Sequence, residues 1–142
     1  MVLGAATLAT GACARRANTG PESIQPSELA SLLASPKPSK PLILQVGFRV
    51  LYQQAHIPGS EYIGAASEPD GLSRLRTRVK SLPRGAFIVI YCGCCPWNRC
   101  PNIKPAYAAL KAMGFSNVRE LRLLRNFGAD WVDKGYPVAK GP

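Results

Sequence analysis

The stretch AFIVIYCGCCPWNRCPN, residues 86–102, contains the features that decide the fold. Residues 86–91 are apolar and rich in β-branched side chains, which predicts a buried strand. Residues 105–115 carry apolar side chains at helical spacing, with Gly114 where a helix would end. The four cysteines between them therefore lie on a strand-to-helix loop at the carboxyl end of a strand, where α/β proteins place their ligands.

Cys92 is the first residue after the predicted strand and the best candidate for a nucleophile. Arg99, Lys104 and the unpaired N–H groups of the following helix would lower its pKa, and the thiolate is the reactive form of a cysteine. Three further thiols follow on the loop, at Cys94, Cys95 and Cys100. A lone buried cysteine is usually inert, but four clustered thiols favour chemistry or metal binding.

The same cysteines permit two other interpretations. Zinc or an iron–sulfur cluster would use the four sulfurs, but structural zinc sites pair two Cys-x2-4-Cys knuckles across a longer stretch. The spacing therefore disfavours a metal, and we expect no metal and no cofactor. In an oxidising compartment the alternative is a disulfide within the loop, such as Cys95 with Cys100 or Cys92 with Cys95.

The chain has 142 residues and a formal net charge of +10, from 18 Lys and Arg against 8 Asp and Glu. This length predicts one domain with a substantial core. The basic residues gather in two groups, residues 74–84 and residues 119–125. We interpret the first group as a solvated helix face, and the excess charge favours a small anionic partner. The sequence has no aromatic interleaving or zinc-finger spacing, so we expect no nucleic acid partner.

Residues 1–20 differ from the rest of the chain. Residues 1–13 are apolar with small side chains, and Arg15 and Arg16 end that run. The segment resembles a bacterial export signal, and residues 10–13 (TGAC) resemble a lipoprotein attachment box. We predict an exported, periplasmic protein that is cleaved or attached to the membrane through a lipid on Cys13. The alternative is a disordered tail before a domain that spans residues 21–142.

Predicted strands and helices alternate along the rest of the chain. Strands are expected at residues 42–46, 61–63, 86–91 and 118–121, and helices at residues 26–33, 72–82, 105–115 and 129–134. This order predicts an α/β fold with a central parallel sheet, helices on both faces and right-handed crossovers.

Several of these segments, taken in order, resemble the rhodanese family of sulfurtransferase domains. The segment AHIPGS at residues 55–60 resembles the family signature GHIPGA, and IVIYC at residues 88–92 resembles the strand that delivers the active cysteine. The pattern is completed by residues 24–29, 110–118 and 131–138. The resemblance covers residues 24–138 and implies the rhodanese-like fold.

The resemblance also implies an activity, that of a thiosulfate-type sulfurtransferase. Cys92 would take a sulfane sulfur from a small anionic donor, hold it as a persulfide or mixed disulfide, and pass it to a thiol acceptor. Arg99 would stabilise the anion. The intermediate would be resolved by Cys94, Cys95 or Cys100.

The loop departs from the common family pattern. Leu110 comes eighteen residues after Cys92, so the loop is longer than in that pattern, and Arg99 has no secure equivalent. The alternative function is therefore a non-catalytic rhodanese-fold module that binds a metal or a protein partner through its cysteine-rich loop. A phosphatase is a weaker third option, because six residues separate Cys92 from Arg99 instead of five.

Four other residues invite a functional interpretation. We interpret His56 as a structural residue whose imidazole hydrogen-bonds the backbone of its turn. Trp131 and Tyr136 are predicted core residues. Trp97, beside Pro96 in the thiol loop, is expected either to cover the site or simply to pack.

Overall fold

The computed structural model of the chain describes residues 22–142. The predicted N-terminal segment, residues 1–20, and its Cys13 lie outside the described residues. Within residues 22–142, no helix combines the length and the apolar character needed to cross a membrane.

Five parallel strands form one sheet in the order β1-β5-β4-β2-β3. The strands are Ser23–Ile24 (β1), Leu42–Gln45 (β2), Glu61–Tyr62 (β3), Ile88–Tyr91 (β4) and Val118–Leu121 (β5). β4 is central, with Ile88 opposite Leu42 of β2 and Val118 of β5. All four residues of β4 are buried, as expected of a strand covered on both faces.

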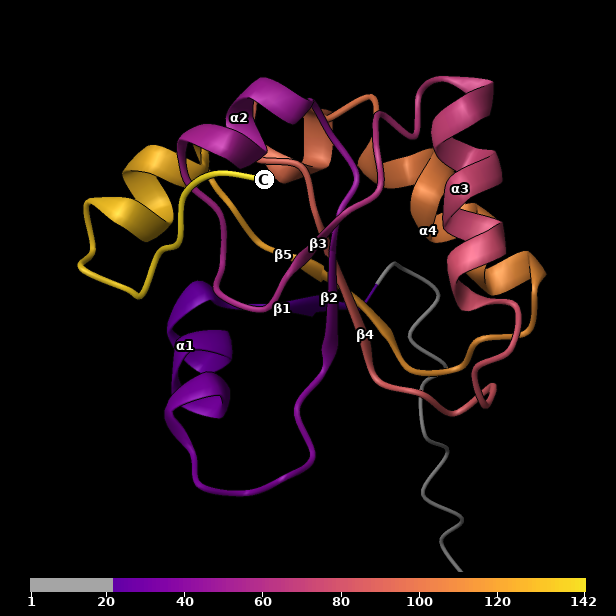
Figure 1. Ribbon diagram of the computed structural model, residues 1–142, viewed down its shortest axis with the longest axis horizontal. Coiled ribbons are helices and arrows are strands. Elements are labelled where there is room, and N and C mark those ends of the chain that lie inside the picture. The colour runs from indigo at the N-terminus through magenta and orange to yellow at the C-terminus, as the bar shows by residue number, and fades with distance from the viewer. Residues whose placement is uncertain (1–21) are drawn as a thin grey trace, which may run out of the picture.

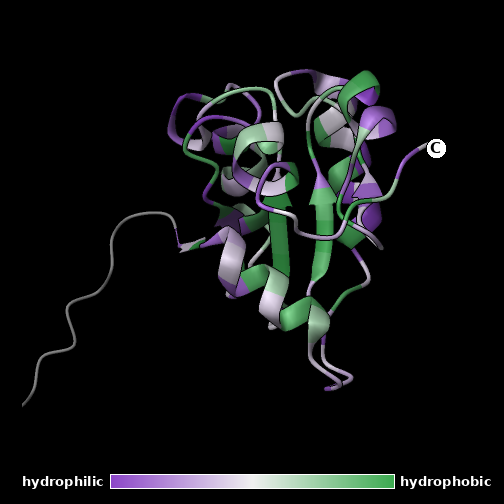
Figure 2. Cartoon of the chain, turned by 90° about the vertical axis from the view of Figure 1, so that its left-hand side faces the viewer, coloured by the Kyte–Doolittle hydropathy of each residue, from purple (hydrophilic) through white to green (hydrophobic). Residues whose placement is uncertain are grey.

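Helices cover both faces of this sheet, which confirms the predicted α/β class. They are Pro26–Ala34 (α1), Arg49–Gln54 (α2), Pro69–Val79 (α3) and Ile103–Ala112 (α4), with a 3-10 turn at Trp97–Arg99 (η1) and a π-helical turn at Gly128–Val132 (η2). Figure 1 shows α3 and α4 on one side of the sheet and α1 on the other. Figure 2 shows hydrophobic strands at the centre of the fold, between helices of mixed character.

Two apolar cores result, one on each side of the sheet. Ile88 and Ile90 of β4 pack with α3 and α4, whereas Val89 and Tyr91 pack with α1 and η2. This division follows from the strand geometry, because successive side chains point to opposite faces. Cys92 continues the alternation and joins the core under α3 and α4.

Some boundaries differ from the prediction. The helix α2 was not predicted; it has six residues, of which only Tyr52 is buried, so it has no apolar period to detect. α4 begins at Ile103, two residues before the predicted start, and Pro105 lies in its first turn, where its missing N–H costs no hydrogen bond. The turn η2 ends at Val132, earlier than the predicted helix.

His56 has the structural role that was predicted. Its Nδ1 lies 2.7 Å from the carbonyl oxygen of Tyr52, and its ring stacks on the Tyr52 ring at 3.8 Å between centroids. Its backbone pairs with Ala139, which ties the end of the chain to the sheet. Gly59 then turns the chain with a φ of 78°, a conformation that favours glycine. The prediction of a core position is confirmed for Trp131, whereas Tyr136 is only partly buried and packs against that core.

Candidate functional site

The site begins where β4 ends. Cys92 directly follows the strand and is only 3% exposed. Gly93 then reverses the chain with a φ of 95°, and a side chain there would meet the Cβ of Phe127 at 3.0 Å. The loop continues through η1 and brings Cys100 back to the same core, where it is 2% exposed. A sharp turn at a glycine therefore places both ends of the cysteine loop in one place.

Four sulfur atoms converge in this loop. The Sγ atoms of Cys92 and Cys94 lie 3.4 Å apart, and those of Cys94 and Cys95 lie 2.9 Å apart. The sulfurs of Cys92, Cys94 and Cys100 all lie within 4.8 Å of one another. All four residues are free thiols, so neither of the disulfides considered from the sequence is formed here. The cluster is therefore a reduced group of thiols that is close enough for sulfur exchange or for shared binding of one soft ion.

Two buried amide side chains hold Cys92. The Nδ2 atom of Asn102, which is fully buried, donates to the Cys92 sulfur at 3.3 Å, and its Oδ1 atom accepts from the backbone N–H of Ser67 at 2.9 Å. Gln45 donates from Nε2 to the Cys92 carbonyl oxygen at 2.9 Å and accepts from the N–H of Gly47 at 3.1 Å. A Cβ on Gly47 would lie 2.6 Å from the Cys92 sulfur, so only glycine leaves room for this thiol.

The pKa is lowered at Cys100 and raised at Cys92, which differs from the expectation that Cys92 has the lowered pKa. The Cys92 thiol donates to Cys100, and with the backbone N–H groups of Asn102 and Ile103 this lowers the pKa of Cys100 to about 5. Donation to Cys100, together with burial, raises the pKa of Cys92. Burial also raises the pKa of Cys95 to about 12. The contact with Cys92 is the largest cause of the lowered pKa of Cys100, and the free N–H groups at the start of α4, which face Cys100, add to it.

Within residues 22–142, neither of the two predicted cations forms a hydrogen bond with a sulfur or shifts the pKa of a loop cysteine. Arg99 is exposed on η1, and within residues 22–142 its guanidinium makes no hydrogen bond. Lys104 instead lies near Glu120, a buried carboxyl group of β5. Burial raises the pKa of Glu120 to about 7, while Lys104 opposes the shift. The backbone N–H of Trp97 donates to the carbonyl oxygen of Leu123, just after β5, and Arg122 lies over the Trp97 ring.

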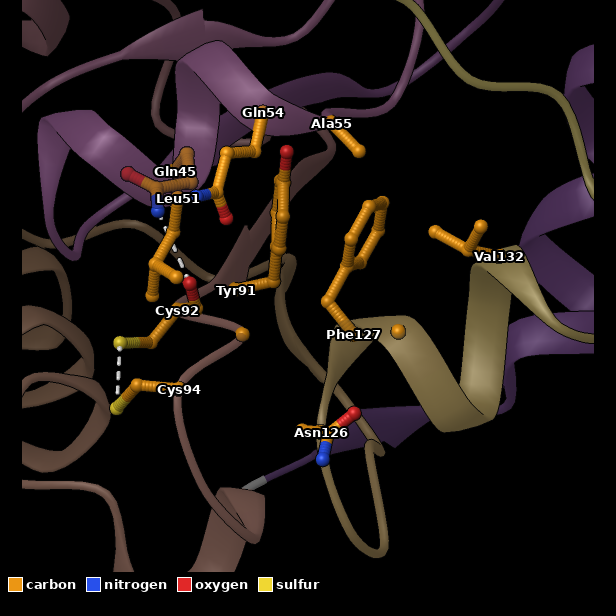
Figure 3. A pocket seen from close by; sticks show the side chains of 12 residues that line it. Gln45, Leu51, Gln54, Ala55, Tyr91, Cys92, Cys94, Asn126, Phe127 and Val132 are labelled. Atoms are coloured by element: carbon orange, nitrogen blue, oxygen red, sulfur yellow. Dashed lines mark hydrogen bonds between the residues drawn. The ribbon is translucent and has the colours of Figure 1, made fainter.

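A cavity of about 340 Å³ opens beside Cys92. Figure 3 shows the sulfurs of Cys92 and Cys94 directed toward each other at one side of it, with the rings of Tyr91 and Phe127 alongside. The described residues that line it carry no formal charge; they are Gln45, Leu51, Gln54, Ala55, Tyr91, Cys92, Gly93, Cys94, Asn126, Phe127, Gly128 and Val132. A concave, mainly apolar lining with a few polar groups is typical of a small-molecule site.

The sequence model of the rhodanese-like domain family matches residues 25–123. The chain belongs to the rhodanese-like family. Its fold resembles that of a rhodanese-like domain from Anabaena sp., with 25% identity, a TM-score of 0.62, and coverage of 85% of this chain and 80% of that one.

Two sulfurtransferases have similar folds. A thiosulfate sulfurtransferase from Pseudomonas aeruginosa is 23% identical, with a TM-score of 0.62 over 86% of this chain and 21% of that chain. A single-domain sulfurtransferase from Saccharomyces cerevisiae is 15% identical, with a TM-score of 0.59 over 83% of this chain and 94% of that chain. No curated protein matches the sequence.

Sequence reasoning missed the residues that support the thiols in this rhodanese-like domain. Asn102 stands at the end of the loop, directly before a helix, where asparagine is a common cap. Here no side-chain cap bond forms, and the amide binds Cys92 and Ser67 instead. Gln45 and Gly47 were not predicted to belong to the site. Both are far from Cys92 in the sequence, Gln45 by 47 residues, and no local pattern links them to it.

Proposed function

We propose that this rhodanese-like domain is a sulfurtransferase that carries sulfur on Cys92. One observation carries the proposal: the Cys92 thiol at the carboxyl end of β4 lines the cavity and also contacts the other thiols. A donor in the cavity reaches Cys92. The sulfur that Cys92 accepts could then pass to Cys94, whose Sγ lies 3.4 Å from the Sγ of Cys92. The sulfurtransferases with similar folds support this class of reaction.

The reaction takes place in two displacements. The Cys92 thiolate, which forms when its proton moves to Cys100, attacks the outer sulfur of the donor. The new S–S bond gives the Cys92 persulfide, and the donor leaves with the electron pair of its broken S–S bond, as sulfite from thiosulfate or as a thiolate from an organic persulfide. A second thiolate then attacks the outer sulfur, takes it over as its own persulfide and frees Cys92. No net oxidation occurs, because each step exchanges one S–S bond for another.

The second thiolate is that of Cys94 or of a free acceptor thiol. Cys94 is exposed, whereas Cys92 is buried, so a transfer from Cys92 to Cys94 brings the sulfur to the surface. Cys95 and Cys100 are the neighbouring thiols that compete for the same sulfur. The uncharged lining of the cavity favours an organic persulfide as donor, because its carbon groups pack against Leu51 and Phe127. The net charge of +10 favours a small anionic donor, and Arg99 would contribute to that attraction.

Mass spectrometry tests the assignment. Reduced full-length protein is treated with thiosulfate or with a persulfide of glutathione, and the peptides are fragmented to locate the added sulfur. Cleavage after Arg99 separates Cys100 from the other three loop cysteines. The peptide mass therefore distinguishes sulfur on Cys100 from sulfur on the other three, and fragmentation locates it among those three. We expect the first sulfur on Cys92, no loading in Cys92→Ser, and normal loading in the control Cys13→Ser. Sulfur found only on another cysteine, or normal loading of Cys92→Ser, would contradict the proposal.

We also propose that the protein is exported and attached to the membrane through Cys13. The sequence of residues 1–20 supports this proposal. Fractionation of cells that express the gene should place the protein in the membrane fraction, and Cys13→Ser should release it. Unprocessed protein in the cytosol would contradict this proposal and favour the alternative interpretation of residues 1–20 as a tail.

A further inference from the structure

We propose that Cys92, Cys94 and Cys100 form a binding site for one copper(I) ion. This inference goes beyond sulfur transfer and does not depend on it. It rests on the positions of three sulfurs from a loop of nine residues, which the fold brings within 4.8 Å of one another. Two of these sulfurs are buried and the third is exposed, so the site is closed on one side and accessible on the other.

The spacing of the sulfurs fits a three-coordinate ion. Metal–sulfur bonds of about 2.3 Å around a trigonal ion place the sulfurs about 4 Å apart. The observed upper limit of 4.8 Å and the Cys92–Cys94 separation of 3.4 Å bracket that value. Binding therefore requires only small adjustments of side chains that are already in place, and the ordering cost is low.

The donor set selects a soft ion. All three ligands are thiols, and the group contains no histidine or carboxylate. Thiolates favour copper(I) and zinc over the hard ions, which prefer oxygen ligands. Zinc requires a fourth ligand in a tetrahedron, where neighbouring sulfurs would lie about 3.8 Å apart. Cys95 is the remaining sulfur, but it lies only 2.9 Å from Cys94, its neighbour in the chain. A three-thiolate site without Cys95 fits copper(I) better.

The surroundings stabilise the ligands as a metal site requires. The amide of Asn102 donates to the Cys92 sulfur at 3.3 Å and fixes its position. Free N–H groups at the start of α4, from Asn102 and Ile103, face the Cys100 sulfur and offset the negative charge of the thiolates. Contacts of this kind beyond the ligands orient them and strengthen binding in known metal sites.

Competition for copper(I) tests the site. Reduced, metal-free, full-length protein is titrated anaerobically against the coloured copper(I) complex of bicinchoninate, and loss of colour reports transfer of copper. We expect one copper(I) per chain, with a thiolate-to-copper charge-transfer band in the near ultraviolet. The exposed ligand gives the test variant: Cys94→Ser should weaken binding by about tenfold or more. Cys95→Ser and Cys13→Ser are matched controls, and both should bind with wild-type affinity.

Any of the following results would overturn the proposal. If the protein takes no copper from the complex, or if Cys94→Ser binds as tightly as wild type, the three sulfurs are not the ligands. If Cys95→Ser loses binding as severely as Cys94→Ser, or if one zinc ion displaces copper, the site is a four-sulfur zinc centre. Circular dichroism of every variant checks the fold. The sulfur-loading assay is read separately, so a domain that transfers sulfur without binding copper contradicts only this inference.

Discussion

Two consecutive residues, Tyr91 and Cys92, face opposite sides of the sheet and have different surroundings. Tyr91 stacks on Phe127 at 5.4 Å between ring centroids, and Phe127 stacks on Trp131 at 6.0 Å. Trp131 also donates from Nε1 to the Pro137 carbonyl oxygen at 2.8 Å. On the other side, Cys92 lies among thiols and is held by the amide of Asn102. One side of β4 thus carries aromatic packing, and the other carries reactive groups.

Because of this difference, the residues on one side of β4 contribute mainly to stability and those on the other mainly to reactivity. Aromatic rings bury large apolar surfaces and contribute strongly to the free energy of unfolding. Thiols bury little surface, and their value lies in ionisation, nucleophilic attack and metal binding. The two sides meet at the cavity, which Tyr91, Phe127 and Cys92 line together. We call the side of β4 that Tyr91 faces the aromatic side, and the side that Cys92 faces the sulfur side. We expect substitutions on the aromatic side to change stability and substitutions on the sulfur side to change reactivity.

The largest effect is expected from Trp131→Ala. Trp131 is fully buried, and removal of its ring leaves a cavity that should lower the free energy of unfolding by about 3–5 kcal/mol. Urea unfolding measures this change. The control Leu124→Ala, at an exposed residue, should change stability by less than about 0.5 kcal/mol. Sulfur loading of the folded variant should remain normal. A variant that stays as stable as wild type but loads no sulfur would contradict this division of roles between the two sides.

Glu120 provides the next effect, on the sulfur side. The folded protein holds its pKa at about 7, above its value in the unfolded chain, so folding favours the protonated carboxyl. The resulting stability is present below the ordinary glutamate pKa and is lost as the pH rises through about 7. Glu120→Gln should remove this loss, so the stability of the variant relative to wild type should be greater at pH 8 than at pH 4 by about 3 kcal/mol.

Urea unfolding of both proteins across this pH range measures the change. The exposed Glu28 gives a matched control, because Glu28→Gln should keep the pH dependence of wild type. If the free energy of unfolding changes with pH in the same way for Glu120→Gln and wild type, this carboxyl does not titrate within the folded core.

Gly47→Ala tests the packing of Cys92, the proposed nucleophile. The new methyl group would lie 2.6 Å from the Cys92 sulfur and 3.1 Å from Nε2 of Gln45, so the thiol must move. Because attack requires close alignment, we expect the rate of sulfur loading on Cys92 to fall by about tenfold. The control is Gly85→Ala, where a Cβ meets no atom within 4 Å, and its rate should equal that of wild type. Rapid-quench mass spectrometry follows both rates, and an unchanged rate in Gly47→Ala would show that the Cys92 sulfur has freedom to shift.

The sequence predicted the parts of this molecule that depend on local patterns. The apolar run before Cys92 predicted the central strand, and the order of strands and helices predicted the parallel sheet. The turn at His56 was predicted from its resemblance to a family signature, and its hydrogen bonds agree. These features rest on periodicity and on short segments whose residues contact one another.

The electrostatics of the site could not be predicted in the same way. The lowered pKa of Cys100 depends on its contact with Cys92 and on the free N–H groups at the start of α4, which begins at Ile103. Convergence of the sulfurs depends on the turn at Gly93, which one sequence position does not reveal. The contact of Gln45 with Cys92 joins two strands that are distant in the chain. Such features follow from tertiary structure, and a single sequence contains no local signal for them.

The smallest effect is expected at Arg99, the cation first proposed to stabilise the anion. Its side chain is exposed on η1 and, within the described part of the chain, forms no hydrogen bond with any of the four sulfurs. Its charge therefore acts on a donor only through solvent, where salt screens it. We expect Arg99→Ala to change the free energy of unfolding by less than about 0.5 kcal/mol. Loading from thiosulfate should slow by no more than about threefold at physiological salt.

A comparison of donors sharpens this prediction. Arg125→Ala, at another exposed arginine, should slow loading from thiosulfate to a similar extent, because both changes remove one surface charge. Added salt should reduce the effect of either substitution. A loss of 100-fold or so in Arg99→Ala alone would mean that the guanidinium reaches the anion directly, and the η1 turn would then have to move toward Cys92 when the donor binds.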